Sequence, residues 1–478
     1  MRTKHIIKIT GVFFTAVFML ACQSSQLAQH KVNRPLPAIF TSDSVALVLP
    51  NWREVFFDPM LRDLIDSALS GNFDLRIAGT RIEGAQAEVR LNRGIRLPEL
   101  NLSLASGIRK FGDYTMDGVG NYDTRFSPNI SDKQMIPQNP LPDYFIGFQS
   151  SWEIDLWGKL KSKKKAAAAR FISSQYARDL VMTGLIADIA STYYQLLALD
   201  KELKIINDNI ALQQSALEMV QSIKESGMGN QLAVETMYAQ LLNFKATETE
   251  VKQKIIDCES RLSFLCGTYP EKIRRDSLML NFESKVLPGI PSDLLRNRPD
   301  IRQAEYEIVA SNADVHAAKM AFYPQLNINY AMGLQSFKAH LLLETPASLA
   351  YNLLGNLSAP LLNRRKLKAE LMAASAVQKQ AYLMYEKTVV SSFMEVYMAL
   401  TRIQNTSELV KLKEEEVNVI KQSVNTSTDL FIAGRAGYLE VILAQKNALK
   451  SQLELNEYQK QLNLENINLY RAIGGGWR

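Results

Sequence analysis

The sequence has little cysteine and histidine, and neither residue type is arranged as a metal site. Its 478 residues contain 3 Cys and 4 His. Zinc and transition-metal sites draw on His, Cys or carboxylates that recur at short spacings, and this sequence has no such spacing. The histidines are scattered along the chain: His5, His30, His316 and His340. The sequence therefore predicts no metal and no cofactor.

Disulfides are not expected either. Cys258 and Cys266 lie eight residues apart in a segment that we expect to be helical. Eight residues of helix rise about 12 Å, which is too far for an S–S bond. The low glycine and proline contents, 23 and 16 residues, exclude collagen-like and low-complexity chains. The protein must therefore be stabilised by the packing of an apolar core.

A strong excess of one charge is also missing. The formal net charge is +6, and Arg2, Lys4 and Lys8 supply half of it. No basic run elsewhere alternates with aromatic residues as a nucleic-acid groove requires. The glycines at 474–476 do not form a phosphate loop, because no Lys-Ser or Lys-Thr follows them. We therefore predict neither nucleic-acid binding nor catalysis.

The first 21 residues have the form of an export signal. Basic residues precede an apolar run at 11–21 that is too short to span a bilayer. Cys22 follows directly, as at a lipoprotein processing site, where the thiol carries diacylglycerol and the new N-terminus an acyl (palmitoyl) chain. Ordinary cleavage with an incidental cysteine is the alternative. Because Gln23 is not the Asp that retains lipoproteins in the inner membrane, we expect Cys22 to anchor the chain in outer-membrane lipid.

The chain repeats itself. Segment 74–100 matches segment 300–326 at a constant offset of 226 residues, for example at Pro98 and Pro324. From Leu160 onward the offset is 207, and it relates Gly227 to Gly434 and Gly267 to Gly474. The first copy therefore carries 19 extra residues between Pro98 and Leu160. Two constant offsets over such lengths indicate an internal duplication.

Each copy has the same expected order of elements: helix, strand, loop, strand, very long helix, turn and helix. In the first copy a helix is expected from about Arg53 to Arg93, and a loop over 109–142 because that stretch is rich in Gly, Asp, Asn and Pro. Apolar residues alternate with polar ones in four segments, which is typical of strands with two different faces. The four strands are expected at about 99–108, 143–154, 324–333 and 350–360.

The long helices carry a heptad pattern. Between Gly158 and Gly227 there is no Pro and only one Gly, so a single helix of roughly 100 Å is possible. Apolar residues recur every seven positions, and the pattern survives the shift of 207 residues, which predicts lateral coiled-coil packing. An ordinary helical-bundle core is the alternative. The seam comprises Ile189, Leu196, Leu203, Ile210 and Leu217 in the first copy and Val396, Ile403, Val410, Val417 and Val424 in the second.

Four strands cannot close a membrane barrel by themselves, because the smallest such barrels have about eight. An open sheet would leave edge groups unpaired in lipid at several kcal/mol each. Identical copies in a closed ring remove the edges, and three chains would supply twelve strands. The number of copies does not follow from this argument alone.

Five segments resemble the TolC/OprM-type outer-membrane factors, in their lipoprotein (OprM/NodT) branch. They span nearly all of the chain after the signal, in the order of that family: WEIDLWG at 152–158, LPGIPSDLLRNRPDIR at 287–302, AFYPQL at 321–326, GYLEVILAQ at 437–445 and LYRAIGGGW at 469–477. The resemblance implies a mainly α protein with a membrane β-barrel. The expected protomer is internally duplicated, with long antiparallel coiled-coil helices and four strands, and forms a trimeric α/β channel-tunnel.

The resemblance also implies partners and a gate. The expected function is the outer-membrane channel of a tripartite efflux system, a passive conduit for drugs or other toxic small molecules. A periplasmic membrane-fusion adaptor and an inner-membrane resistance-nodulation-division pump would complete that system. The family has acidic residues at the second periplasmic helix turn, and Glu440 matches one such position, whereas Ala436 and Leu443 occupy neighbouring ones. Glu440, Arg435 and Asp429 are therefore the candidate gate, through ion pairs between chains.

Two rival functions remain open from the sequence: a periplasmic lipid-anchored coiled-coil adaptor, and a structural protein without a pore. An adaptor would have a single hairpin in a β-rich chain, whereas this sequence has two. The expected division of the chain is a signal at 1–21, an extended equatorial segment at 22–52, a first repeat at 53–267, an equatorial linker at 268–292 and a second repeat at 293–478.

Overall fold

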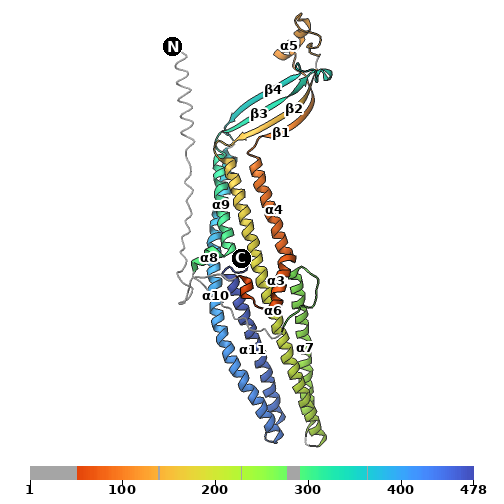
Figure 1. The fold of residues 1–478 in the computed structure, drawn as a ribbon, viewed down its shortest axis with the longest axis vertical. Coiled ribbons are helices and arrows are strands. Elements are labelled where there is room, and N and C mark those ends of the chain that lie inside the picture. Colours follow the sequence, from red (N-terminus) through yellow and green to blue (C-terminus); the bar gives the residue numbers. More distant parts are fainter. Residues whose placement is uncertain (1–50, 138–139, 228, 277–290, 363, 478) are drawn as a thin grey trace.

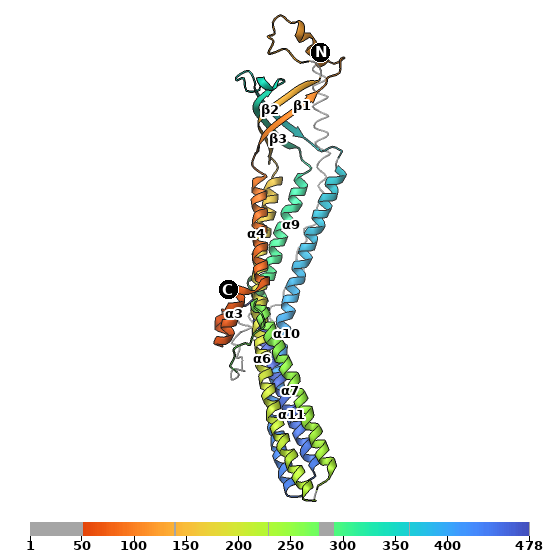
Figure 2. The ribbon, with the colours of Figure 1, turned by 90° about the vertical axis from the view of Figure 1, so that its right-hand side faces the viewer.

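The computed structural model describes residues 51–137, 140–227, 229–276, 291–362 and 364–477. A four-stranded sheet lies at one end of an elongated molecule, and long helices extend away from it to two hairpin turns at the other end (Figures 1 and 2). The export signal, Cys22 and most of the 268–292 linker, which were expected from the sequence, lie outside the described residues.

The duplication predicted from the sequence is confirmed by the elements. The offset of 226 relates α4 to α9 along their whole length, and the offset of 207 relates the starts of α7 and α11. The first copy comprises α4 (Phe73–Gly94), β1 (Glu99–Arg109), β2 (Leu141–Ile154), α6 (Lys159–Glu225) and α7 (Gln231–Cys266). The second comprises α9 (Pro299–Met320), β3 (Gln325–Ser336), β4 (Leu349–Ser358), α10 (Arg364–Ile432) and α11 (Tyr438–Ala472).

The prediction of one helix from Arg53 to Arg93 was wrong. The segment forms α2 (Trp52–Val55), α3 (Pro59–Gly71) and α4. The first break lies between α2 and α3. The Asp58 side chain caps the start of α3, and Pro59 is the first residue of that helix. At the second break, the Asn72 side chain caps α4 by accepting from the Leu75 amide at 3.0 Å, and it donates to the Leu265 carbonyl at 2.8 Å. The break is therefore set by a contact with α7, far along the chain.

The loop expected at 109–142 is partly helical. It contains α5 (Met116–Asp123) and the short 3-10 helix η1 (Thr124–Phe126). Thr115 explains the start of α5, because its hydroxyl accepts from the Gly118 amide at 3.1 Å. The equivalent connection in the second copy holds only η2 (Ala339–Leu341), and one further short helix, α8 (Pro291–Asn297), precedes α9.

The long helices pack as antiparallel hairpins, α6 with α7 and α10 with α11. Beside the sheet, α4, α6, α9 and α10 lie side by side in a single layer, as Figure 2 shows. One 18-residue window of α6 is apolar enough to cross a membrane, but 61% of that window is buried inside the molecule, as in a core helix. The heptad seam forms this core: Ile189, Leu196 and Val396 have no exposed surface.

Candidate channel wall and periplasmic tip

The sheet has one strongly apolar face. Its strands are antiparallel in the order β1-β2-β3-β4, and residues that pair across strands share a face. Leu104 is 78% exposed and Tyr351 is 77% exposed, so the described residues leave this face uncovered. It carries Leu100, Leu102, Leu104 and Ile108 on β1, Ile146, Phe148 and Trp152 on β2, Leu326, Ile328, Tyr330 and Met332 on β3, and Tyr351, Leu353 and Leu357 on β4.

The opposite face is polar or small, apart from Leu141, Phe145 and Leu354. Such alternation on every strand is the pattern of a membrane barrel, apolar toward lipid and polar toward a water-filled lumen. This face carries Asn101 and Ser103 on β1, Asp143, Gln149, Ser151 and Glu153 on β2, Asn327, Asn329 and Gln335 on β3, and Asn352, Asn356 and Ser358 on β4.

A row of four small residues crosses the polar face. Ser103 pairs with Gly147, Gly147 with Gly333, and Gly333 with Ala350. A Cβ atom on Gly147 would lie 2.4 Å from the Cα of Gly333, so side chains cannot be accommodated where the two middle strands approach. Glycine at such a position allows strands to bend, and the strands curve visibly in Figure 1.

The edges of the sheet are open. Among the described residues, β1 pairs only with β2, and β4 pairs only with β3. Each edge strand therefore presents a row of unpaired backbone groups beside an apolar face. A single chain with these edges is incomplete as a membrane structure.

The junction between sheet and helices is tied by two tryptophans. The indole of Trp152 donates to the Arg96 carbonyl at 3.0 Å, and that of Trp157 donates to the Pro324 carbonyl at 2.7 Å. The rings of Trp157 and Tyr323 lie 5.2 Å apart. The Asp155 carboxylate then accepts from the first amides of α6. Aromatic side chains of this kind mark the membrane surface in many proteins.

Buried polar groups hold the middle of the molecule together. The Arg298 side chain, 7% exposed, donates to the Ala472 carbonyl at 2.7 Å and pairs with Asp300 and Glu395. Burial lowers the pKa of the Arg298 guanidinium, but the hydrogen bonds and charges of those two carboxylates outweigh it and raise the pKa. Arg298 thereby joins the start of α9 to α10 and to the C-terminal end of α11.

A second buried contact joins the segment before α3 to α6. The Tyr193 hydroxyl donates to the Asp58 carboxylate at 2.5 Å. Burial, and then this hydrogen bond, raise the pKa of Tyr193 far above its usual range. The phenol therefore stays protonated at any physiological pH, and the contact is structural.

The two helix turns at the far end are chemically different. At the α6–α7 turn, Gly227 has φ +82° and the Asn230 side chain caps α7 by accepting from the Ala233 amide. At the α10–α11 turn, Gly434 has φ +69°, and the Arg435 amide donates to the Leu430 carbonyl at 2.8 Å. Both turns need glycine because other residues rarely adopt such a φ.

The structure places the three candidate gate residues in or beside the second turn. Asp429 and Arg435 are exposed near the end of α10, and Glu440 is exposed in the first turn of α11. Within the described chain none of them forms an ion pair. The Glu440 carboxylate folds back over Gly437, where a Cβ would lie 2.9 Å from its Oε2. All three side chains are thus free to meet a neighbouring molecule, and a gating role stays a prediction.

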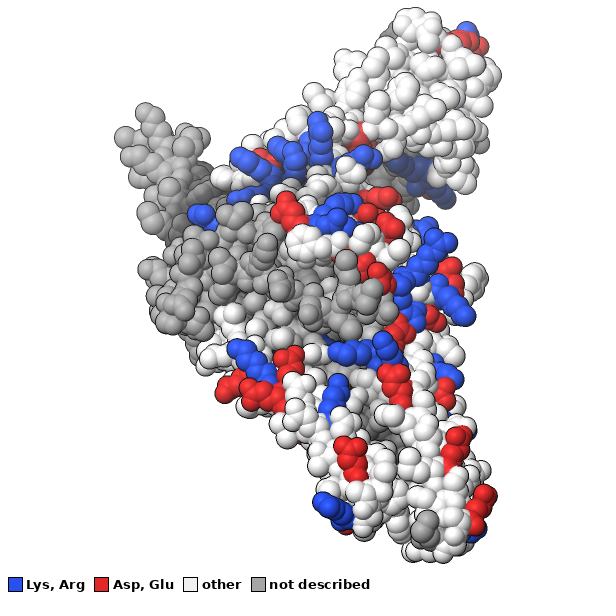
Figure 3. Space-filling view, turned by 60° about the horizontal axis from the view of Figure 1, so that its bottom comes forward, with Lys and Arg blue, Asp and Glu red and all other residues white. Residues whose placement is uncertain are grey.

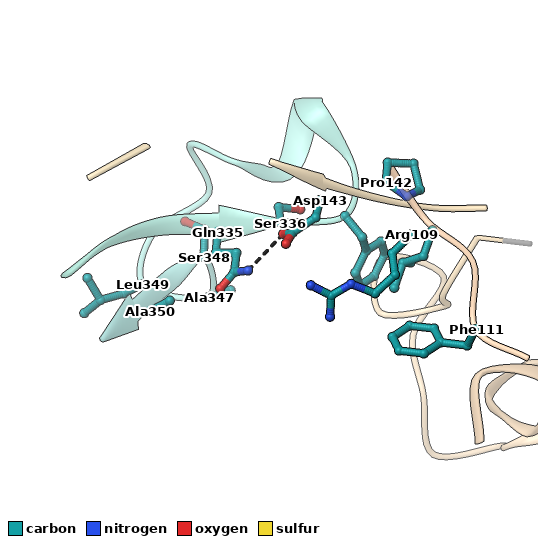
Figure 4. A pocket seen from close by; sticks show the side chains of 12 residues that line it. Arg109, Phe111, Pro142, Asp143, Gln335, Ser336, Ala347, Ser348, Leu349 and Ala350 are labelled. Carbon is teal, nitrogen blue, oxygen red and sulfur yellow. Dashed lines mark hydrogen bonds between the residues drawn. The ribbon is translucent and has the colours of Figure 1, made fainter. Parts of the chain in front are cut away.

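The distal end of the sheet has a small open cleft of about 380 Å³. Figure 4 shows the Gln335 amide donating to the Asp143 carboxylate, at 2.9 Å, beside Arg109 and Phe111. The cleft lies where the polar face meets the two distal loops. Those loops are joined by the ion pair of Lys133 and Glu344 at 2.9 Å. The described residues include no group of three or more His, Cys, Asp or Glu side chains that could hold a metal ion.

Sequence reasoning did not find the role of Arg298 or the close pair of Gly147 and Gly333. Arg298 stands in the segment at 287–302 that carries the resemblance, but only the fold brings it to Ala472 and Glu395. The two glycines were visible in the sequence, and the alternation of the strands around them was the signal that could have paired them.

A two-faced sheet with open edges, continued by long helical hairpins, defines one segment of the wall of a membrane channel. The model of the outer membrane efflux protein family matches residues 64–268 and 290–475. The chain belongs to this family, and it is an outer-membrane efflux channel.

Known proteins align with this chain over almost its whole length. The solvent efflux pump outer membrane protein SrpC of Pseudomonas putida is 30% identical over 440 residues, which are 91% of this chain and 89% of the relative. The probable outer membrane lipoprotein SilC of Salmonella typhimurium is 26% identical over 98% of this chain and 99% of its own. The open-state crystal structure of the MtrE channel of Neisseria gonorrhoeae has the same fold, with a TM-score of 0.80, 22% identity, and coverage of 95% and 98%.

The rival reading as a periplasmic adaptor is wrong. The chain has two long hairpins with four strands at their opposite end, and the family that it matches is one of outer-membrane channels.

Proposed function

We propose that three copies of this chain close into a twelve-stranded barrel that continues into a periplasmic tunnel of helices. The observation that carries the proposal is the sheet, with one apolar face and two unpaired edges. Joining β1 of one copy to β4 of the next satisfies every edge group and leaves no edge in lipid. The apolar face then meets lipid, and the polar face lines the lumen.

For this assembly we propose the same division of the chain that the sequence predicts. A signal at 1–21 is removed, segment 22–52 and the linker at 268–292 lie at the equator of the tunnel, and the repeats at 53–267 and 293–478 each supply two strands and one hairpin. Three double units would surround the lumen with six similar walls. The shared offsets of the elements support this pseudo-sixfold arrangement.

The channel works as a passive conduit in a three-part export system. A periplasmic membrane-fusion adaptor binds the hairpin end, and an inner-membrane resistance-nodulation-division pump supplies the energy. The two hairpin turns support this role, because they lie at the end of the molecule farthest from the sheet (Figure 1). No catalytic activity is proposed for the chain itself.

The cargo is a toxic small molecule, such as a drug or an organic solvent. The polar face is rich in Asn, Ser and Gln and carries no strong charge of one sign. Such a surface passes molecules without selecting them, so the pump would make the selection. The solvent efflux relative SrpC supports solvents as one class to test.

Cys22 is the proposed lipid attachment site, with diacylglycerol on the thiol and a palmitoyl chain on the nitrogen. The lipoprotein relative SilC, which aligns with 98% of the chain, supports it. The anchor would hold the start of the chain at the outer membrane while the barrel spans it. Glu440, Arg435 and Asp429 are the proposed periplasmic gate.

The direct test of function is deletion of the gene followed by growth on a panel of organic solvents, drugs and metal salts. Sensitivity that is restored by the wild-type gene supports export, and the pattern identifies the class of cargo. The purified protein in a planar bilayer should show discrete conductance steps. A folded, membrane-inserted protein without conductance would refute the channel.

A further inference from the structure

Lysine and arginine gather where the helices leave the sheet. Figure 3 shows them beside the mostly uncharged sheet. We call the following residues the basic collar. They lie in the first two turns of α6 and α10: Lys161, Lys163, Lys164, Lys165, Arg364, Arg365, Lys366 and Lys368.

The collar has little internal neutralisation. The stretch from Lys159 to Arg170 contains no acidic residue, and Lys159, which is not part of the collar, already pairs with Glu153 at 2.5 Å. Within the part of the chain that the structure describes, the collar forms only one ion pair, Lys366 with Glu370 at 3.9 Å between largely exposed side chains. The remaining collar cations face solvent or are half-exposed.

The position of these charges is unfavourable for the helices themselves. The start of a helix carries partial positive charge, so cations there reduce helix stability, and neither α6 nor α10 has an acidic residue in its first turn. Local folding therefore gives no reason for the collar. Binding of an anionic partner outside the chain would explain why these cations are present.

The depth of the collar identifies that partner. The apolar face of the sheet ends at the pair of Ile154 and Leu326, and the exposed rings of Trp157 and Tyr323 follow at the junction. Aromatic residues occupy the level of the lipid headgroups. The collar begins within about two helical turns of them, roughly 10 Å farther from the barrel. Lysine and arginine side chains extend from this level toward the phosphate groups of a membrane surface.

The duplication supplies an independent observation. At the offset of 207, Lys366 takes the place of Lys159 and Lys368 that of Lys161. The two lysines recur together with the leucine between them, whereas Glu370, Leu371 and Met372 take the places of Lys163, Lys164 and Lys165. Each repeat therefore begins its long helix with its own cluster of basic residues, and a closed ring of three chains would carry six such clusters around the base of the barrel.

We propose that the basic collar binds the phosphate groups of anionic phospholipids at the periplasmic surface of the outer membrane. The collar fixes the depth of the barrel in the bilayer and stabilises the assembled channel. This inference rests on the proposed barrel, whose own failure would show separately as an absence of conductance in any lipid.

The test measures thermal unfolding of the full-length protein in detergent micelles doped with phosphatidylglycerol or with phosphatidylcholine. Phosphatidylglycerol should raise the midpoint by at least about 3 °C over phosphatidylcholine, because a ligand of the folded state stabilises it. In 1 M salt the Debye length falls to about 3 Å, and the difference should disappear. Soluble glycerophosphate at the same concentration should have no effect, because the collar is proposed to bind phosphate groups only where they are gathered at a lipid surface.

Two collar variants test the residues, one in each repeat. Lys161→Gln, Lys163→Gln, Lys164→Gln and Lys165→Gln are combined in the first. The second combines Arg364→Gln, Arg365→Gln, Lys366→Gln and Lys368→Gln. Each should lose at least half of the phosphatidylglycerol effect and keep its midpoint in phosphatidylcholine.

Matched controls decide the outcome. Lys245→Gln, Lys411→Gln, Lys421→Gln and Lys446→Gln remove four exposed charges far from the sheet and should keep the full effect. Lys→Arg changes in the collar should also keep it, and they remain informative if a Gln variant fails to fold. An unchanged phosphatidylglycerol effect in both collar variants, an equal loss in the distant control, or an effect from glycerophosphate alone would overturn the proposal.

Discussion

Single residues at the hairpin turns are where the channel is expected to open and close. Glu440 is exposed in the first turn of α11 and forms no ion pair among the described residues of its own chain, so its charge is available to an adjacent copy. We expect Glu440→Gln to raise single-channel conductance in planar bilayers. An exposed ion pair contributes about 0–1 kcal/mol, so each lost pair would favour opening by up to about fivefold.

Glu415→Gln is the matched control for this prediction, because Glu415 is an exposed acid on α10 away from the turn. Its conductance should equal that of the wild type. If Glu440→Gln behaves like the control, Glu440 is a solvated helix-end residue that favours the start of α11.

The number of reactive thiols per chain tests whether Cys22 carries a lipid. Cys258 and Cys266 are free and buried, and burial raises the pKa of each thiol, so little thiolate is available to react. In the native mature protein both should react with a maleimide at least about tenfold more slowly than in denaturant. After denaturation, two reactive thiols per chain are expected, because acylation blocks Cys22. A count of three would show that Cys22 carries no lipid.

At the level of elements, the α3–α4 break depends on contact with the end of α7. A Cβ on Gly71 would lie 2.3 Å from the Cys266 carbonyl oxygen. We expect Gly71→Ala to destabilise the fold by about 1–3 kcal/mol, seen as a lower thermal midpoint. Gly84→Ala is the control, since nothing lies within 4 Å of its added Cβ, and it should be neutral or stabilising. Equal effects of the two changes would contradict the close packing at Gly71.

The start of α9 is held by a buried cation. Arg298→Met leaves the Ala472 carbonyl without its donor and the carboxylates of Asp300 and Glu395 without their cation. Loss of one partner from a buried pair costs about 3–5 kcal/mol, so the thermal midpoint should fall markedly. Arg296→Met changes an exposed neighbour and should have little effect. A wild-type midpoint for Arg298→Met would show that the pairs are not needed for stability.

The elements also show what sequence patterns can predict. The long helices were predictable because their seams at Ile189, Leu196 and Val396 obey a local period and no proline interrupts them. The strands were predictable because polar and apolar residues alternate along them. The break at Asn72 was not, because it is set by Leu265 and Cys266, residues brought near only by folding. Local periodicity carries the first kind of information, and long-range contact carries the second.

The candidate gate is limited in a different way. Glu440, Arg435 and Asp429 could be named from the turn and the resemblance, and the structure confirms only that they are exposed near the turn. Their proposed partners belong to other copies of the chain. Neither the sequence nor the fold of a single copy determines contacts across a threefold axis.

At the level of the whole molecule, the account depends on closure of the sheet edges. Within the described residues of one chain, β1 and β4 each have an unpaired edge beside an exposed apolar face, and the proposed ring of copies would pair both. The efflux tunnel, the gate and the sixfold collar all require that ring. The number of chains in the folded assembly is therefore the quantity that tests closure of the sheet most directly.

Static light scattering of the purified protein in mild detergent measures that number directly, once the detergent mass is subtracted. Each chain has a mass of 53.8 kDa before the signal is removed. The account predicts a single species with about three times the mass of the mature chain, which falls to one chain on heating. A folded species with the mass of one chain would contradict it, because β1 and β4 would then remain unpaired.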